Sequence, residues 1–170
     1  QFRNIVLKAT REYERYKAQQ VEASTMVDPA ESKIYEDEEW EVYIPKTRGA
    51  CIKLGSRSWC TAARGSGAPY KKYTKNKERY PLIIFIPKNS SDENEKYQFH
   101  YYGLNGKGEF VDQENDTLWD SDPVILKDLN VLVATKLKGK IADHISLDAT
   151  KLLNANFPEA LAGPKVANTK

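Results

Sequence analysis

PLIIFIPKNSSDENEKYQFHYYGLNGKGEFVD, residues 81–112, contains three segments with strand patterns. Residues 82–86 are apolar at every position, which is typical of a central strand with both faces covered. Residues 97–101 alternate aromatic and polar side chains. The glycine-rich segment 105–108 then favours a tight turn, because Asn and Gly tolerate positive φ. Residues 109–112 are therefore expected to return as an antiparallel partner of residues 97–101.

Two segments before this stretch extend the predicted fold. Residues 40–44 are apolar at every second position and stop at Pro45, as in a half-buried strand. Apolar residues recur at spacings of three and four from Phe2 to Tyr16, which predicts an N-terminal amphipathic helix over residues 1–23. Residues 24–39 lose this periodicity and carry an acidic cluster, so they are expected to form an acidic connecting loop.

Helices are predicted near the C-terminus. Asp122 provides a carboxylate cap ahead of Pro123, and helical spacing of apolar residues continues until Gly139, which is expected to end the helix. A shorter helix is expected from Ile141 to Leu153, followed by an irregular tail over residues 156–170. Strands between terminal helices predict an α+β fold with a central antiparallel sheet.

The composition predicts one folded domain, with its α+β core over residues 40–155. A chain of 170 residues with 40% hydrophobic residues and a net charge of +2 can build its own core. Its apolar runs are far shorter than the roughly 20 residues of a membrane-spanning helix, so no membrane partner is expected. Cys51 and Cys60 lack a metal-ligand spacing, so we expect reduced thiols, no metal and no cofactor.

Basic residues are concentrated in the middle of the chain. Residues 46–79 contain ten basic residues and one acidic residue. The aromatic residues within or beside this segment are Trp59, Tyr70, Tyr73 and Tyr80. Flat rings beside cations can stack on bases and neutralise phosphates, so nucleic acid or an acidic protein surface is the expected partner. The predicted polyanion-binding residues are Arg57, Arg64, Lys71, Lys72, Tyr73, Lys75, Lys77 and Arg79.

A competing interpretation is that neighbouring acidic segments neutralise this charge. Residues 28–41 contain seven acidic residues, and residues 92–122 contain nine. Solvated ion pairs between these segments and the basic segment would leave a neutral polar surface, although such pairs contribute little stability. The sequence leaves both interpretations open.

Gly55, Trp59, Cys60, Thr61 and Ala62 form a compact block after a predicted helical turn at residues 50–54. This Gly-x-x-x-Trp-Cys-Thr-Ala block, followed by the Lys-Tyr-Gln-Phe-His motif at residues 96–100, resembles a family of bacteriophage and large-DNA-virus proteins that has no established activity. The resemblance covers about half of the chain, roughly residues 40–116. It implies a viral protein located in the cytoplasm of the host cell or in the virion, and it implies no mechanism.

Two catalytic hypotheses use residues of these motifs. Cys60, His100 and Asp112 would form a thiol, a base and an orienting carboxylate if the segments that carry them adjoin. Alternatively, Arg57, Tyr73, His100 and Asp112 would surround a nucleotide or nucleobase and support glycosidic-bond or ADP-ribose chemistry. The structural alternative is a small buried cysteine and a hydrogen-bonded strand histidine.

The preferred functional hypothesis is a virus- or phage-encoded interaction module without chemistry of its own. It would bind nucleic acid or another polyanion through the basic, aromatic-bearing central face. The first alternative is the nucleotide- or nucleobase-directed enzyme. The second is a structural virion or assembly component that packs against other virion proteins through the first helix, and it predicts apolar surface left exposed on that helix.

Overall fold

The computed structural model describes residues 2–24, 29–62, 81–101 and 107–162. The elements in chain order are α1 (Phe2–Ser24), η1 (Pro29–Ser32), β1 (Lys33–Glu36), β2 (Trp40–Tyr43), α2 (Arg48–Leu54), β3 (Ile83–Pro87), β4 (Tyr97–Tyr101), β5 (Gly108–Val111), α4 (Leu118–Ser121), α5 (Pro123–Leu132), η2 (Val133–Leu137), α6 (Lys138–Ala142), α7 (Leu147–Asn156) and η3 (Glu159–Ala162). The five strands form one antiparallel sheet in the order β1-β2-β3-β4-β5. The predicted α+β fold is therefore confirmed.

The predicted hairpin is present as the antiparallel pair β4 and β5. Phe99 lies opposite Phe110, and His100 lies opposite Glu109. Because successive side chains of a strand point to opposite faces, Phe99 and His100 belong to different sides of the sheet. Of the predicted turn at residues 105–108, positions 105 and 106 lie outside the described residues, and Gly108 is the first residue of β5.

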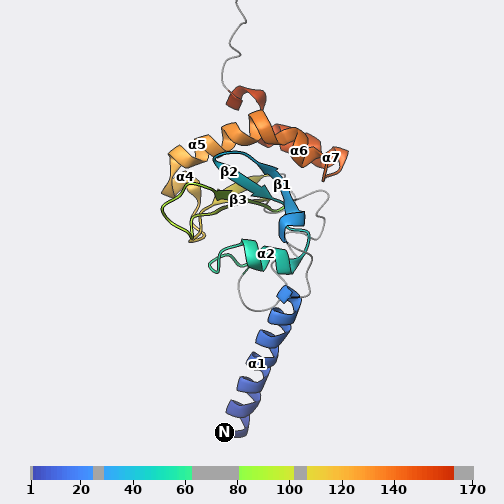
Figure 1. The fold of residues 1–170 in the computed structure, drawn as a ribbon, viewed down its shortest axis with the longest axis vertical. Coiled ribbons are helices and arrows are strands. Elements are labelled where there is room, and N and C mark those ends of the chain that lie inside the picture. Colours follow the sequence, from blue (N-terminus) through green and yellow to red (C-terminus); the bar gives the residue numbers. More distant parts are fainter. Residues whose placement is uncertain (1, 25–28, 63–80, 102–106, 163–170) are drawn as a thin grey trace, which may run out of the picture.

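Helices cover both faces of the sheet (Figure 1). On one face, α5, η2, α6 and α7 enclose the larger core, in which Phe85, Phe99 and Phe110 pack with apolar helix residues. On the other face, α2 and the turn after it enclose a smaller core that includes Cys51 and Trp59. This second face also carries the polar residues of β4, so it is the face on which the candidate site lies.

Strand β1 occupies part of the segment that was expected to be a connecting loop, so this prediction was wrong for residues 33–36. Lys33–Glu36 pairs antiparallel with β2, with Lys33 opposite Tyr43 and Glu36 opposite Glu41. The strand has only four residues and lies at the edge of the sheet, where charged side chains reach solvent. Such a short strand depends on pairing with β2 more than on its own hydrophobic pattern.

The helix that begins after Asp122 does not end at Gly139, contrary to the prediction. The Asp122 Oδ1 atom accepts a hydrogen bond from the Ile125 N–H at 3.1 Å, so the predicted cap is confirmed. The helix then continues through the π-helical turn η2 into α6, which includes Gly139. Leu137 and Ile141 are both fully buried on the sheet, and this burial outweighs the cost of about 1 kcal/mol for glycine within a helix.

The end of the domain also differs from the prediction. The chain breaks after α6, and Ser146 caps a separate helix, α7, by accepting a hydrogen bond from the Ala149 N–H at 3.2 Å. Phe157 is 1% exposed and packs in the larger core, although it was assigned to the irregular tail. Helix η3 follows it, so the described fold continues beyond residue 155.

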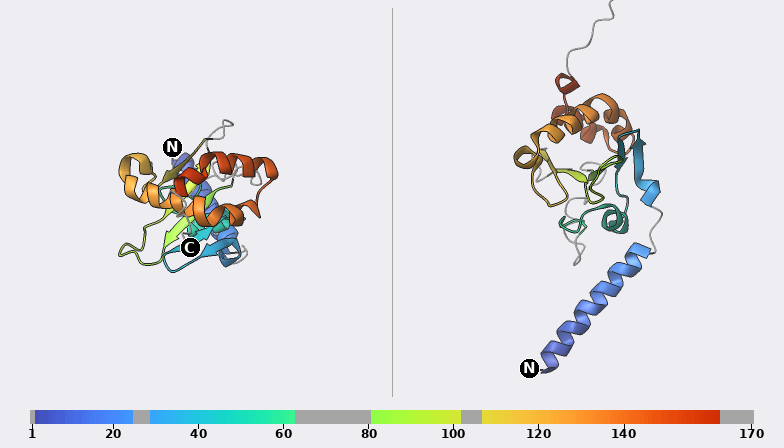
Figure 2. Two further views of the ribbon diagram at one scale, coloured as in Figure 1. Left: turned by 90° about the horizontal axis from the view of Figure 1, so that it is seen from above. Right: turned by 60° about the vertical axis from the view of Figure 1, so that its left-hand side comes forward.

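Helix α1 is present as predicted, and it extends away from the rest of the fold (Figures 1 and 2). Its apolar residues do not contribute to either core: Ile5 is 67% exposed, Val6 48% and Tyr13 60%. Apolar surface is therefore exposed on the first helix, and a role as an assembly component stays a prediction.

Candidate functional site

The Gly-x-x-x-Trp-Cys-Thr-Ala block forms the turn that joins α2 to the second face of the sheet. The Trp59 side chain is fully buried, and its Nε1–H donates a hydrogen bond to the Asp112 carbonyl at 2.6 Å. A Cβ atom at Gly55 would lie 2.5 Å from the Cys51 carbonyl oxygen and 2.7 Å from the Ala62 Cβ. The block therefore needs glycine at position 55 and tryptophan at 59 for packing.

A row of hydrogen-bonded polar side chains, which we call the polar chain, connects this turn to the edge of the sheet. The Thr61 hydroxyl donates to Gln98 Oε1 at 2.8 Å, and Gln98 Nε2 lies 3.1 Å from His100 Nδ1. His100 Nε2 lies 3.1 Å from Glu109 Oε1. An amide nitrogen can only donate, so Nδ1 accepts and Nε2 carries the hydrogen of a neutral imidazole. The polar chain thus ends at the half-exposed carboxylate of Glu109.

Burial determines the charge state of His100. Desolvation lowers its pKa from the ordinary 6.5, while the neighbouring Glu109 carboxylate acts in the opposite direction. Burial likewise raises the pKa of the Cys51 thiol to about 12, and its hydrogen bond with Thr61 only partly opposes this. Both groups are therefore neutral near pH 7 and serve the packing of this face.

Acidification from pH 7 to pH 5 is expected to destabilise the fold through His100. Its pKa in the fold is below the ordinary 6.5, so the native state favours the neutral imidazole over the charged one. The stability that this shift contributes is present above pH 6.5 and is lost as pH falls through the lowered value. Urea denaturation at both pH values should show a smaller pH effect in His100→Gln than in the parent chain.

His144 provides the matched control for this measurement. It is the other histidine in the sequence, and it is exposed beyond the end of α6. The variant His144→Gln should therefore keep the pH dependence of the parent chain. An equal effect of both variants would contradict the assignment to His100.

The hydrogen bonds that the structure gives for His100 and for the Asp112 carboxylate do not join the three residues of the predicted catalytic trio. Cys60 is exposed, whereas His100 is buried and hydrogen-bonded to Gln98 and Glu109. The Asp112 carboxylate instead accepts hydrogen bonds from backbone N–H groups of its own loop, at 2.9 Å from Glu114 and 3.0 Å from Asp116.

The surroundings of Asp112 also differ from those of Cys60 and His100. Asp112 lines a depression of about 370 Å³ together with Tyr97 and Asp122, and neither Cys60 nor His100 lines it. The carboxylate beside the imidazole is that of Glu109, which our sequence reasoning missed. The signal that identifies it is the register of the predicted hairpin, since position 109 lies opposite position 100.

Among the predicted polyanion-binding residues, Arg57 is exposed in the turn after α2. Two further basic residues of segment 46–79 are also exposed, namely Lys46 just before α2 and Lys53 in its last turn. The other predicted members lie outside the described residues, namely Arg64, Lys71, Lys72, Tyr73, Lys75, Lys77 and Arg79. The second catalytic hypothesis places Arg57, Tyr73, His100 and Asp112 around a nucleotide. Of these four residues, Tyr73 lies outside the described residues.

Trp59 cannot serve as a stacking platform, contrary to the role expected of it. Its relative exposure is 0%, because the turn places the indole between α2 and the sheet. Stacking on a base requires an accessible ring face. The tryptophan of the motif therefore supports the fold, and a stacking role stays a prediction for the tyrosines at positions 70, 73 and 80.

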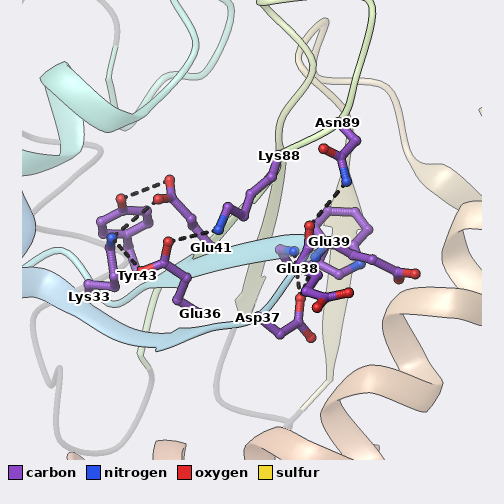
Figure 3. Close-up of polar contacts among 10 residues, drawn as sticks. Lys33, Glu36, Asp37, Glu38, Glu39, Glu41, Tyr43, Lys88 and Asn89 are labelled. Carbon is purple, nitrogen blue, oxygen red and sulfur yellow. Dashed lines mark hydrogen bonds and ion pairs between the residues drawn. The ribbon is translucent and has the colours of Figure 1, made fainter.

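Glu36 at the end of β1 and Glu41 in β2 form ion pairs with lysines from outside the basic segment (Figure 3). Lys33 Nζ lies 3.1 Å from Glu36 Oε2 and 3.2 Å from Glu41 Oε1, and Lys88 Nζ lies 2.9 Å from Glu36 Oε1. Lys136 approaches Asp37 at 3.9 Å. In the described ranges, none of the ion pairs includes Lys46, Lys53 or Arg57. The ion pairs described for acidic segment 28–41 therefore involve lysines outside segment 46–79.

None of the described helices is both long and apolar enough to cross a bilayer. Within residues 2–24, 29–62, 81–101 and 107–162, no group of three or more His, Cys, Asp and Glu side chains is arranged to hold a metal ion. No protein-family model, curated protein or solved structure matches the chain.

Proposed function

We propose that this chain is an interaction module that binds nucleic acid through the side of the fold formed by α2 and the turn after it. The single observation that carries the proposal is the separation of charges in the described structure. Lys46, Lys53 and Arg57 are exposed in α2 or in the segments that flank it, and we call these residues the cationic surface, while acidic residues pair with other lysines at the β1 edge. Unneutralised cations on one side favour a polyanionic ligand.

The sequence strengthens this proposal. The cationic surface belongs to segment 46–79, whose ten basic residues accompany one acidic residue. The tyrosines at positions 70 and 73 supply rings that suit bases better than they suit acidic protein side chains. Nucleic acid is therefore the polyanion that we favour. The viral origin and the location in host cytoplasm or virion stay predictions from the resemblance.

A catalytic function receives less support from the described geometry. His100 uses both ring nitrogens within the polar chain, and the Asp112 carboxylate caps its own loop. Nucleophilic catalysis needs a thiol in contact with a base, and the partners of the His100 ring nitrogens given by the structure are an amide and a carboxylate. The arrangement supports stability of the second face more directly than bond cleavage.

The test is the affinity of the purified chain for fluorescent single- and double-stranded oligonucleotides across a salt series. Binding through phosphate contacts should weaken steeply with salt, because each contact releases condensed counterions. The double variant Lys53→Glu with Arg57→Glu should bind roughly tenfold or more weakly at physiological salt. Its salt dependence should also be shallower.

A charge-matched control distinguishes binding through the cationic surface from a general effect of net charge on affinity. Lys140 and Lys151 are exposed on α6 and α7, across the sheet from α2 (Figure 1). Lys140→Glu with Lys151→Glu makes the same change in net charge and should reduce affinity much less. Equal losses in both double variants, or no binding by the parent chain at low salt, would refute the proposal.

A further inference from the structure

The exposed side of α1 has the spacing of a two-stranded coiled-coil seam. Val6, Ala9, Tyr13 and Tyr16 follow one another at intervals of three, four and three residues. This is the alternation of a and d positions in a heptad, with an average period of 3.5 residues. The described seam residues are exposed, and in Figures 1 and 2 α1 extends away from the sheet, with its Ser24 end on the α2 side of the fold. The seam is therefore accessible along the described part of the helix.

Several apolar side chains of α1 are exposed, which favours a partner that covers them. Val6 is 48% exposed, Tyr13 60% and Tyr16 43%, and Ile5 beside the seam is 67% exposed. Single exposed apolar residues are common, but several gathered on one side of a helix mark an interaction surface. A helix whose exposed part extends beyond its own domain also gains stability from a partner helix.

Charge at the flanking positions identifies the partner as a second copy in parallel orientation. In a parallel pair, the g position of one helix faces the following e position of the other. By sequence, Glu12 occupies a g position and Lys17 the following e position, so the pair is attractive and occurs twice by symmetry. A fully overlapped antiparallel pair would instead bring Glu12 near its own copy and Arg3 near Lys17, which is repulsive.

We propose that the chain forms a homodimer through a parallel coiled coil of α1. The seam residues of one helix pack against the same residues of the second copy. This inference goes beyond nucleic-acid binding and does not depend on it. It also gives the assembly-component hypothesis a defined contact, since the first partner of α1 is another α1.

The dimer would have a consequence for the cationic surface, and this consequence alone rests on the proposed function. The Ser24 end of α1 lies on the α2 side of the fold (Figure 1). Parallel helices bring both copies of that side to the same end of the assembly. Two cationic surfaces would then face one nucleic acid and raise its effective affinity.

The oligomeric state of the full chain tests this proposal directly. Sedimentation velocity over a concentration series should show a monomer–dimer equilibrium. Val6→Glu should weaken dimerisation roughly tenfold or more, because it places a carboxylate from each copy in the seam. Leu7→Glu makes the same change one residue later, at a 54% exposed position outside the seam, and should leave the dimer nearly intact. Equal effects of both variants would overturn the seam assignment.

A cysteine placed in the seam tests the orientation. Ala9 faces Ala9 of the second copy in the parallel arrangement, so Ala9→Cys in a Cys60→Ser background should form a disulfide-linked dimer on oxidation. In the antiparallel arrangement Ala9 would face Tyr13, and no such link would form. A monomer at every concentration, or a dimer without the link, would overturn the proposal. Oligonucleotide affinity of Val6→Glu at low salt, measured separately, distinguishes loss of dimerisation from loss of nucleic-acid binding.

Discussion

Replacing Trp59 with alanine is expected to lower the free energy of unfolding by about 3–5 kcal/mol. The indole is fully buried between α2 and the sheet, so its removal leaves a cavity in the smaller core. The variant also loses the hydrogen bond from Nε1 to the Asp112 carbonyl, which leaves a partly buried acceptor without that donor. Urea denaturation monitored by far-ultraviolet circular dichroism measures the loss.

Two controls separate the contributions of volume and hydrogen bonding. Trp59→Phe keeps much of the buried volume but removes the Nε1 donor, so it should cost less than the alanine variant. Arg57→Ala, at an exposed position of the same turn, should change stability by only about 0.5 kcal/mol or less. A loss below about 1 kcal/mol in Trp59→Ala would contradict the packing role assigned to the block.

The strands in the middle of the chain were predictable because their signals are local. The apolar run at residues 82–86 and the alternation at residues 97–101 each specify a strand through side-chain period alone. The glycine-rich turn then restricts how residues 109–112 can return. Strand β1 has no comparable pattern, and its formation depends on backbone pairing with β2, which sequence periodicity does not reveal.

The candidate site was harder to predict because its partners come from different elements. The sequence identified His100 as notable but paired it with Cys60 and Asp112. Burial and strand register instead join it to Gln98 and Glu109. Asp112 lies two residues beyond the Phe110 that pairs with Phe99, where the strand has ended and the carboxylate caps the next turn.

The charge pattern illustrates a different limit of sequence reasoning. Counting acidic and basic residues cannot show which of them pair, because pairing follows from the placement of β1, β2 and the β3 terminus. In the structure, Lys33 pairs with Glu36 and Glu41 and Lys88 pairs with Glu36, so these two carboxylates find their partners at their own edge of the sheet. Binding through the cationic surface therefore stays a proposal, and these ion pairs are consistent with it.

Replacing Phe157 with alanine is expected to lower the free energy of unfolding by about 3–5 kcal/mol. Its ring is 1% exposed and lies 5.1 Å from the ring of Phe99 and 6.0 Å from that of Phe110, measured between centroids. Aromatic pairs at these separations add to the stabilisation from burial alone. Thermal and urea denaturation of the purified variant measure the effect.

Phe157 also shows that the core extends past α7, because it is buried in a segment that the sequence predicts to be a tail. The exposed neighbour Pro158 gives the control: Pro158→Ala should leave the free energy of unfolding nearly unchanged. A chain ending at Ala155 should lose as much stability as Phe157→Ala or more, whereas a chain ending at Ala162 should unfold like the parent. If the chain ending at Ala155 unfolds like the parent, β4 and β5 do not need a C-terminal aromatic ring to close the larger core.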